Sequence, residues 1–305
     1  MTLKNHKYSI FATVAFVAII LIVFYPREVI DTPIDEEGDL FYAPPRAKEP
    51  GDILVVLDIY ELLDGQSQEL AFGEGYVWHA DSGQTARNVI SKISAGEELE
   101  TYNNPEAIKH LGGLAYSSNN IWGVDCQLPY GTDYEGTIYK IDTKELISGE
   151  SWEKAIVSSF SASYPYTNQN AGLTCEDDTC QFIWLANWGQ PAGIYRIDTE
   201  KAIADGFISQ DSVTRTILPI GTHTNFQGLA WANDYLWVVD STPLKQAILK
   251  IDPHSGSIVT EYALGTFVSE ENCPENTCEG EGLAYDGEHL WFSTTRPQKL
   301  YKLAV

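Results

Sequence analysis

The chain has 305 residues, of which 43 are acidic and 19 are basic, so its formal net charge is −24. This charge argues against a nucleic-acid ligand, because a surface that binds phosphates needs clustered Lys and Arg side chains. It argues equally against binding to an anionic membrane surface. It permits cationic partners and hard metal ions, although acidity that only aids solubility would give the same composition.

An uncharged and almost wholly apolar segment spans residues 8–25. About 18 apolar residues are just enough to cross a bilayer as a helix. Lys4 and Lys7 precede the segment, which predicts that residues 1–7 are cytoplasmic and that the rest of the chain is periplasmic or extracellular. We therefore predict a single-pass signal-anchor helix in the cell membrane. A cleaved signal peptide is the alternative, although no small-x-small cleavage site follows the segment.

Residues 26–50 are rich in Pro and acidic residues, which predicts an extended linker that buries little apolar surface. A short apolar run with β-branched residues follows at 52–59 and predicts a strand. We assign residues 51–305 to a single folded domain, because repeats of one unit cover most of this range.

The domain contains five copies of this unit. In three of them a Gly-Leu-Ala segment that ends in an aromatic residue is followed by a Trp nine residues after the Gly, and these are Gly113 with Trp122, Gly228 with Trp237 and Gly282 with Trp291. A fourth copy leads to Trp78 and has Glu69 in the Gly position. A fifth runs from Gly172 to Trp184 with three extra residues. Self-similarity of this kind identifies a repeat architecture.

Each repeat predicts four antiparallel strands, of which the third is a run such as Ile-Tyr-Lys-Ile-Asp at 138–142. Four strands in a unit of roughly 40 to 60 residues indicate a propeller blade, so we predict an all-β, five-bladed β-propeller. The last repeat ends at Val305 after its third strand. The strand at 52–59 is therefore expected to complete that blade and close the ring. The inserts after Asp142 and Asp198 predict one helical turn each.

The run Gly-Leu-Ala-Tyr-Asp-Gly-Glu-His-Leu-Trp at 282–291 and the run at 138–142 resemble the repeats of NHL, YVTN and SMP-30/gluconolactonase propellers. They are also similar to the five-bladed propellers of the plant-type glutaminyl cyclases. The similarity covers residues 52–305. It concerns the packing of blades, so it implies a fold and not a chemistry.

The cysteines form two pairs with four residues between the members of each, Cys175 with Cys180 and Cys273 with Cys278. Outside the cytoplasm, two local disulfides are the natural interpretation. A four-cysteine zinc site and free thiols are the alternatives. Cys126 is left over, and we expect it to be a small buried apolar residue.

Polar side chains recur at one end of the repeats. If the first two strands pair as a hairpin, we expect the Gly position to lie across from the third residue after the Trp, at the rim opposite the hairpin turn. In a propeller this rim surrounds one mouth of the central channel. The candidate ligand or metal residues at this mouth are Gln68, Asp81, Asp125, Asn187, Gln227, Asp240 and Glu281.

Oxygen ligands from several blades suit Ca²⁺, Mg²⁺ or Mn²⁺, so the sequence permits a divalent metal such as Ca²⁺ or Mn²⁺ without requiring one. SMP-30-type propellers are similar in placing a metal at this mouth, but their ligand set does not match this chain residue by residue. The alternative is that the Asp side chains cap the loops that follow them by accepting backbone N–H groups.

Two further groups lie near the same rim. Cys126 with His79 or His223 would form a nucleophile and base, but a neighbouring carboxylate raises the pKa of the thiol and no family signature surrounds it. The similarity to glutaminyl cyclases implies an acidic pocket for a substrate amine, for which Glu279 and Glu281 are the candidates.

The absence of a recognisable catalytic constellation favours a non-catalytic function. We predict a membrane-anchored propeller that binds a protein or small molecule at one face of the ring. A metal-dependent (Ca, Mn or Zn) hydrolase or lyase of SMP-30 type is the alternative, and a glutaminyl-cyclase-like propeller is a further one. A purely structural scaffold is also consistent with the sequence.

Overall fold

The computed structural model describes residues 54–62, 67–81, 89–94, 97–103, 108, 110–125, 135–148, 152–163, 166, 172–188, 192–218, 221, 223–242, 246–266, 268, 278–295 and 297–305. The predicted anchor at 8–25 and the predicted linker at 26–50 lie outside these residues. No helix in the described segments combines the length and the apolar character that crossing a membrane requires.

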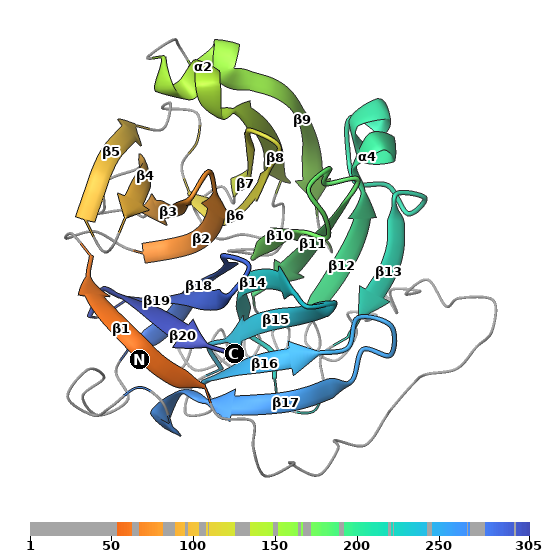
Figure 1. Ribbon diagram of the computed structural model, residues 1–305. Coiled ribbons are helices and arrows are strands. Elements are labelled where there is room, and N and C mark those ends of the chain that lie inside the picture. The colour runs from red at the N-terminus through yellow and green to blue at the C-terminus, as the bar shows by residue number, and fades with distance from the viewer. Residues whose placement is uncertain are drawn as a thin grey trace, which may run out of the picture. The chain divides into compact units, whose positions relative to one another are not determined.

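The described strands form five four-stranded antiparallel sheets, which are the five blades (Figure 1). Blade one contains β2 (Ser67–Gly73), β3 (Tyr76–Asp81), β4 (Val89–Ser94) and β5 (Glu97–Asn103). Blade two contains β6 (Leu111–Ser117), β7 (Asn120–Asp125), β8 (Glu135–Asp142) and β9 (Ile156–Ser163). Blade three contains β10 (Leu173–Cys175), β11 (Phe182–Asn187), β12 (Gly193–Asp198) and β13 (Val213–Ile217). Blade four contains β14 (Phe226–Ala232), β15 (Tyr235–Asp240), β16 (Ala247–Ile251) and β17 (Ile258–Ala263). Blade five contains β18 (Glu279–Tyr285), β19 (His289–Thr295), β20 (Lys299–Ala304) and β1 (Val55–Glu61).

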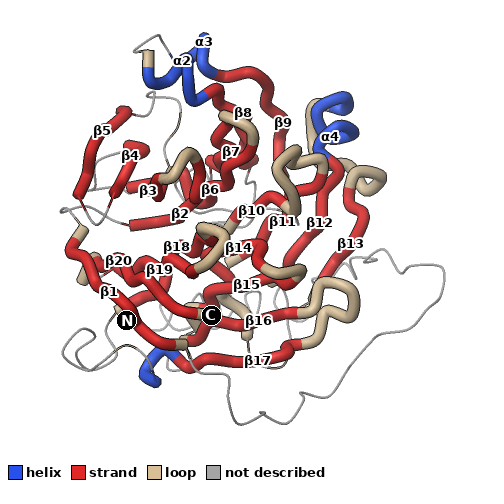
Figure 2. Tube along the Cα trace, viewed as in Figure 1, coloured by secondary structure: helices blue, strands red, loops and turns tan. Residues whose placement is uncertain are grey.

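The blades close into a ring around the first strand of each repeat. Each of these inner strands contacts the inner strand of the next blade, and β18 contacts β2 in turn. The outer strand of blade five is β1, which pairs with β20 along Val55–Glu61 (Figure 2). This confirms the predicted closure, in which the N-terminal strand completes the last blade and pairs what would otherwise be an open sheet edge.

Short helices lie between blades or at their outer ends. They are α2 (Thr143–Ile147), α3 (Trp152–Ala155), α4 (Thr199–Asp205) and the 3₁₀ turn η1 (Leu264–Thr266). Asp142 caps α2 by accepting the N–H groups of Lys144 and Glu145, and Asp198 caps α4 through Lys201. Both predicted helical inserts are thus confirmed, and each begins at the Asp that ends a third strand because that side chain satisfies free N–H groups of the first turn.

The repeated Trp side chains pack between blades. Trp78 is fully buried and stacks on Tyr116 of blade two, with ring centroids 6.3 Å apart. Trp184 stacks in the same way on Trp231 of blade four, at 6.4 Å. The aromatic residue that ends the Gly-Leu-Ala segment therefore covers the Trp of the preceding blade, and the pattern visible in the sequence reports inter-blade packing.

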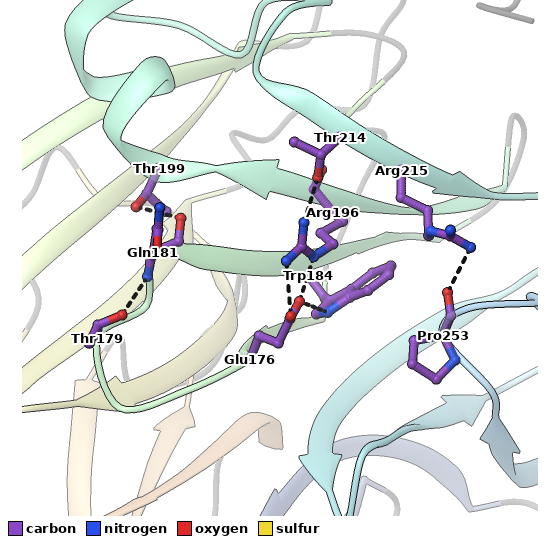
Figure 3. A network of polar contacts seen from close by, with 9 residues as sticks. All are labelled: Glu176, Thr179, Gln181, Trp184, Arg196, Thr199, Thr214, Arg215 and Pro253. Carbon is purple, nitrogen blue, oxygen red and sulfur yellow. Dashed lines mark hydrogen bonds and ion pairs between the residues drawn. The ribbon is translucent and has the colours of Figure 1, made fainter. Parts of the chain in front are cut away.

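Blade three departs from the other blades around this Trp. In the other four, a Lys of the third strand lies over the Trp ring, for example Lys92 over Trp78 at 5.5 Å. In blade three the equivalent residue is Arg196, whose guanidinium forms a two-point ion pair with Glu176 (Figure 3). Glu176 also accepts the indole N–H of Trp184 at 3.1 Å. Glu176 stands in the longer turn of blade three, and in the turn of blade five Asp286 likewise accepts the indole N–H of Trp291, at 2.9 Å.

Candidate functional site

A β-bulge in the inner strands of blades one, two, four and five sets which residues face each other at the mouth. In blade one the register shifts between Ser67 and Leu70, so that Asp81 lies opposite Ser67. Blades two, four and five shift in the same way. The expected pairing of the Gly position with the third residue after the Trp is therefore wrong. The third residue after the Trp instead lies opposite the residue that comes two positions before the Gly position. The extra residue of the bulge, which the sequence pattern does not display, produces part of this shift.

Asp240, at the end of β15, holds the loop that follows it. Its Oδ1 accepts the N–H of Asn225 at 3.3 Å and the N–H and hydroxyl of Thr242 at 3.2 and 2.6 Å. Its Oδ2 lies 2.5 Å from Nδ1 of His223. The side chain is fully buried and fixes both a loop and an imidazole.

Asp125 and Asp81 hold the same position in blades two and one. Oδ1 of Asp125 accepts the backbone N–H of His110 at 2.9 Å. Asp81 is fully buried opposite Ser67, whose hydroxyl lies 2.9 Å from Nε2 of His79. The capping alternative, in which the Asp accepts an N–H of the loop that follows it, is thus seen at Asp240, whereas Asp125 holds the residue that precedes β6.

The amide side chains at the mouth differ from one another. Gln227 donates to the hydroxyl of Ser241 at 3.0 Å and to Oε1 of Glu279 at 3.1 Å, which links blade four to blade five. Gln68 donates from Nε2 to the carbonyl of Ser67, and its Oε1 is buried without a hydrogen-bond partner among the described residues.

The remaining predicted mouth residues are also buried. Asn187 is fully buried at the end of β11, and Glu281 is 3% exposed in β18. Within the described segments, no three His, Cys, Asp or Glu side chains are grouped so that they could hold one metal ion. A divalent metal at this mouth stays a prediction of the sequence alone.

The cysteine predictions are resolved in part. Cys175 and Cys180 form a disulfide across the turn of blade three, as predicted. Cys278 is also disulfide-bonded, and its expected partner Cys273 lies outside the described residues. Cys126 lies outside them as well, so neither its predicted burial nor a pairing with a His is tested.

The axis of the propeller carries a residue that the list of mouth residues omitted. Glu69 of β2 is 1% exposed, and its Oε1 accepts the N–H of Leu70 at 3.0 Å and of Leu283 at 2.7 Å. Its Oε2 accepts the N–H of Leu229 at 3.4 Å. Burial raises the pKa of Glu69 well above its usual value, and the N–H groups of these leucines and of Leu173 act in the opposite direction.

The sequence did contain the signal for this residue, because Glu69 is the one departure from Gly at this position. The glycines there are required by the close approach of neighbouring inner strands. A Cβ at Gly172 would lie 1.7 Å from the carbonyl oxygen of Gln227, and one at Gly228 would lie 2.4 Å from that of Glu281. At Gly282 it would lie 2.7 Å from the nitrogen of Leu70. A side chain at this position must therefore fit against the neighbouring inner strand, and among the five repeats Glu69 is the residue that has one.

A cavity lies between Glu69 and the hairpin turns. This cavity of about 320 Å³ is lined by all five inner strands, with residues such as Leu70, Leu114, Leu229 and Leu283 and the turn residue Asp177. Since Glu69 precedes the first lining residue of β2 and is bonded to three residues of the lining, its carboxyl group stands at the inner end of this cavity.

No protein-family model and no curated protein sequence matches this chain. Solved structures match its fold. Glutaminyl cyclase of Myxococcus xanthus gives a TM-score of 0.58 at 12% identity, over 82% of this chain and 95% of that chain. PQQ-bound aldose sugar dehydrogenase of Streptomyces coelicolor gives 0.48 at 14% identity, over 83% and 81%. An inactive virginiamycin B lyase of Staphylococcus aureus, solved with quinupristin, gives 0.45 at 17% identity, over 83% and 99%. These likenesses concern the β-propeller fold alone, and the narrower resemblance to the NHL, YVTN and SMP-30 groups stays a prediction.

Proposed function

We propose that this chain is a binding propeller whose channel mouth accepts the amine of a protein N-terminus or of a small molecule. The observation that carries the proposal is Gln68, whose buried amide oxygen has no donor among the described residues. A buried acceptor without a donor destabilises the protein by about 1–3 kcal/mol, so a ligand N–H that donates to it gains binding free energy of that order.

The charge of the same mouth favours a cation over a neutral donor. Asp81, Asp125 and Asp240 are fully buried at this end of three blades, and Glu281 is almost fully buried in a fourth. A protonated amine would offset the charge of a carboxyl group that is buried in a region of low dielectric constant. We further propose that residues 8–25 hold the propeller at the outer side of a membrane, as the sequence predicts.

Calorimetric titration of the full chain with short peptides tests this function. We expect peptides with a free N-terminal amine to bind, and the same peptides with an acetylated N-terminus to bind at least about tenfold more weakly, because they lack the charge and its donors. The substitutions Gln68→Met and Glu281→Gln should each weaken binding, while Glu100→Gln, on an outer strand, serves as the matched control. Equal affinity for free and acetylated peptides would contradict the proposal.

A second candidate is the cyclisation of an N-terminal glutaminyl residue. One specific observation favours it, namely the match of this fold to a glutaminyl cyclase over 95% of that chain. In this reaction the α-amine attacks the side-chain amide carbon, a C–N bond forms, and ammonia leaves. Glu279 or Glu281 would take the proton from the amine and return it to the departing ammonia.

Ammonia release separates the two candidates. If the second one holds, a peptide that begins with Gln releases one ammonia per molecule, and Glu281→Gln lowers the rate by about 10²-fold or more. A peptide that begins with Asn is the control substrate. Binding without ammonia release would leave the binding function in place and reject the cyclase.

A further inference from the structure

The arrangement around Glu69 is separate from the mouth residues and plays no part in the function proposed above. Three N–H groups at 2.7–3.4 Å meet its carboxyl group, and they come from blade one, blade four and blade five. A fourth, from Leu173 of blade three, also acts on it. One side chain thus connects four of the five blades.

The four donors are equivalent residues of the repeat. Leu70, Leu173, Leu229 and Leu283 each follow the Gly position, and each lies on the innermost strand of its blade. No further strand lies on the axial side of these strands, so N–H groups that face the axis have no ladder partner. Because buried N–H groups need an acceptor, the repeat itself creates a set of donors that converge on one point.

Glu69 fits this point for two reasons. It occupies the position where the other repeats described above have Gly, so its side chain starts at the wall of the channel. A carboxyl group offers two oxygens with several lone pairs, and it can therefore accept from donors on opposite sides of the axis at once. A neutral single acceptor such as a hydroxyl could not.

We propose that the N–H groups of Leu70, Leu173, Leu229 and Leu283 form a binding site for one carboxyl group, and that Glu69 is its built-in ligand. In this role Glu69 fastens blade one to the far side of the ring. Its shortest contact, 2.7 Å, is with Leu283 of blade five, the blade in which the two ends of the domain meet. This contact holds β18, the innermost strand of the blade whose outermost strand is β1.

The cavity next to Glu69 makes the site testable with a free ligand. About 320 Å³ of space opens from the hairpin turns to the leucines that donate. When the Glu69 side chain is truncated, a small carboxylic acid should reach the same donors from this cavity. Acetate is the probe that we choose, because it reproduces the end of a Glu side chain.

Thermal unfolding of the full chain is the measurement. We expect Glu69→Ala to lower Tm by about 8 °C or more, because four buried donors lose their acceptor. Sodium acetate, titrated to about 0.2 M against sodium chloride at equal ionic strength, should raise the Tm of Glu69→Ala by several degrees, since a ligand of the folded state stabilises it by mass action. Wild type, whose site is filled, should respond to acetate no more than to chloride. Acetamide is the control that lacks the second oxygen.

Either of two results would overturn the proposal. One is a Tm of Glu69→Ala within about 2 °C of wild type, which would mean that the N–H groups do not need the carboxyl group. The other is an acetate effect of equal size in wild type and variant, which would report only a general salt effect. If Glu69→Ala does not fold, its refolding yield in acetate is compared with its yield in chloride. A yield of Glu69→Ala that acetate does not improve would reject the site. Glu69→Gln is the isosteric variant for comparison.

Discussion

Two carboxyl groups in this molecule stand in contrasting places. Glu69 is 1% exposed on the axis and is bonded to backbone groups of separate blades. Glu176 lies in the turn of blade three, its side chain is 25% exposed, and its partners Arg196 and Trp184 belong to its own blade. Both are departures from the shared repeat. The first is a tertiary contact in the buried interior, and the second is a local contact that water can replace.

The contrast has an energetic meaning. An ion pair near the surface contributes little, because water screens it and solvates both partners when it breaks. Removing a buried carboxyl group leaves its N–H donors unpaired, which costs far more of the free energy of unfolding. We therefore expect substitutions at the axis to affect the whole ring, and substitutions at the turn of blade three to have small effects. Four changes test this, in decreasing order of expected effect.

The largest effect is expected for Gly172→Ala. Its Cβ would lie 1.7 Å from the carbonyl oxygen of Gln227, and a backbone atom of the next blade cannot move aside without shifting a strand. We expect a loss of about 3 kcal/mol or more in the free energy of unfolding, measured by denaturant titration. Gly75→Asn is the control, because Gly75 has a φ of 81°, which Asn tolerates, and nothing lies within 4 Å of its Cβ. Equal losses in the two variants would contradict the close approach of the inner strands.

The second test is the pH dependence of stability at Glu69. Burial raises its pKa in the folded state above the ordinary value of 4.5. Protonation therefore favours the folded state, and the stability that this group contributes is lost as the pH rises through the folded-state pKa. We expect the Tm of wild type minus that of Glu69→Gln to be larger at about pH 5 than at about pH 8, because the amide does not titrate. A difference that grew with pH would reject this direction of the pKa shift.

The third test removes the disulfide of blade three. Cys175 and Cys180 are five positions apart, so the bond closes a short loop and restricts the unfolded chain only modestly. Loop-closure entropy predicts a loss of about 2 kcal/mol for the Cys175→Ser, Cys180→Ser double variant. Because Cys278 is also disulfide-bonded, a reductant should still affect this variant, but it should lower the stability of wild type by more. A loss as large as that of Gly172→Ala would mean that the turn supports the ring and not only its own blade.

The smallest effect is expected for Arg196→Lys, which gives blade three the residue of the other blades. Lysine cannot reproduce the two-point contact with Glu176, but it can lie over the Trp as Lys92 does. We expect a loss of about 1 kcal/mol or less, and less still in high salt, because both partners are partly exposed. Lys140→Arg in blade two is the matched exchange. A loss beyond that of the disulfide variant would show that this ion pair is far more than a surface contact.

Much of this architecture could be predicted because the repeat is written into the sequence. The spacing from Gly to Trp fixed the number of blades, and the missing fourth strand after Val305 predicted the pairing of β1 with β20. The two cysteines in the longer turn of blade three predicted its disulfide. These features are local or recur five times, so they can be recognised from the sequence alone.

The tertiary structure alone decided what happens at the axis and the mouth. The β-bulges moved Asp81 opposite Ser67, because a bulge depends on how strands pair and not on the order of apolar residues. Glu69 stood out in the sequence as a departure from Gly, yet its partners are 104, 160 and 214 residues away at Leu173, Leu229 and Leu283. Only closure of the ring brings those N–H groups to one point, and that closure gives a single carboxyl group contact with four blades.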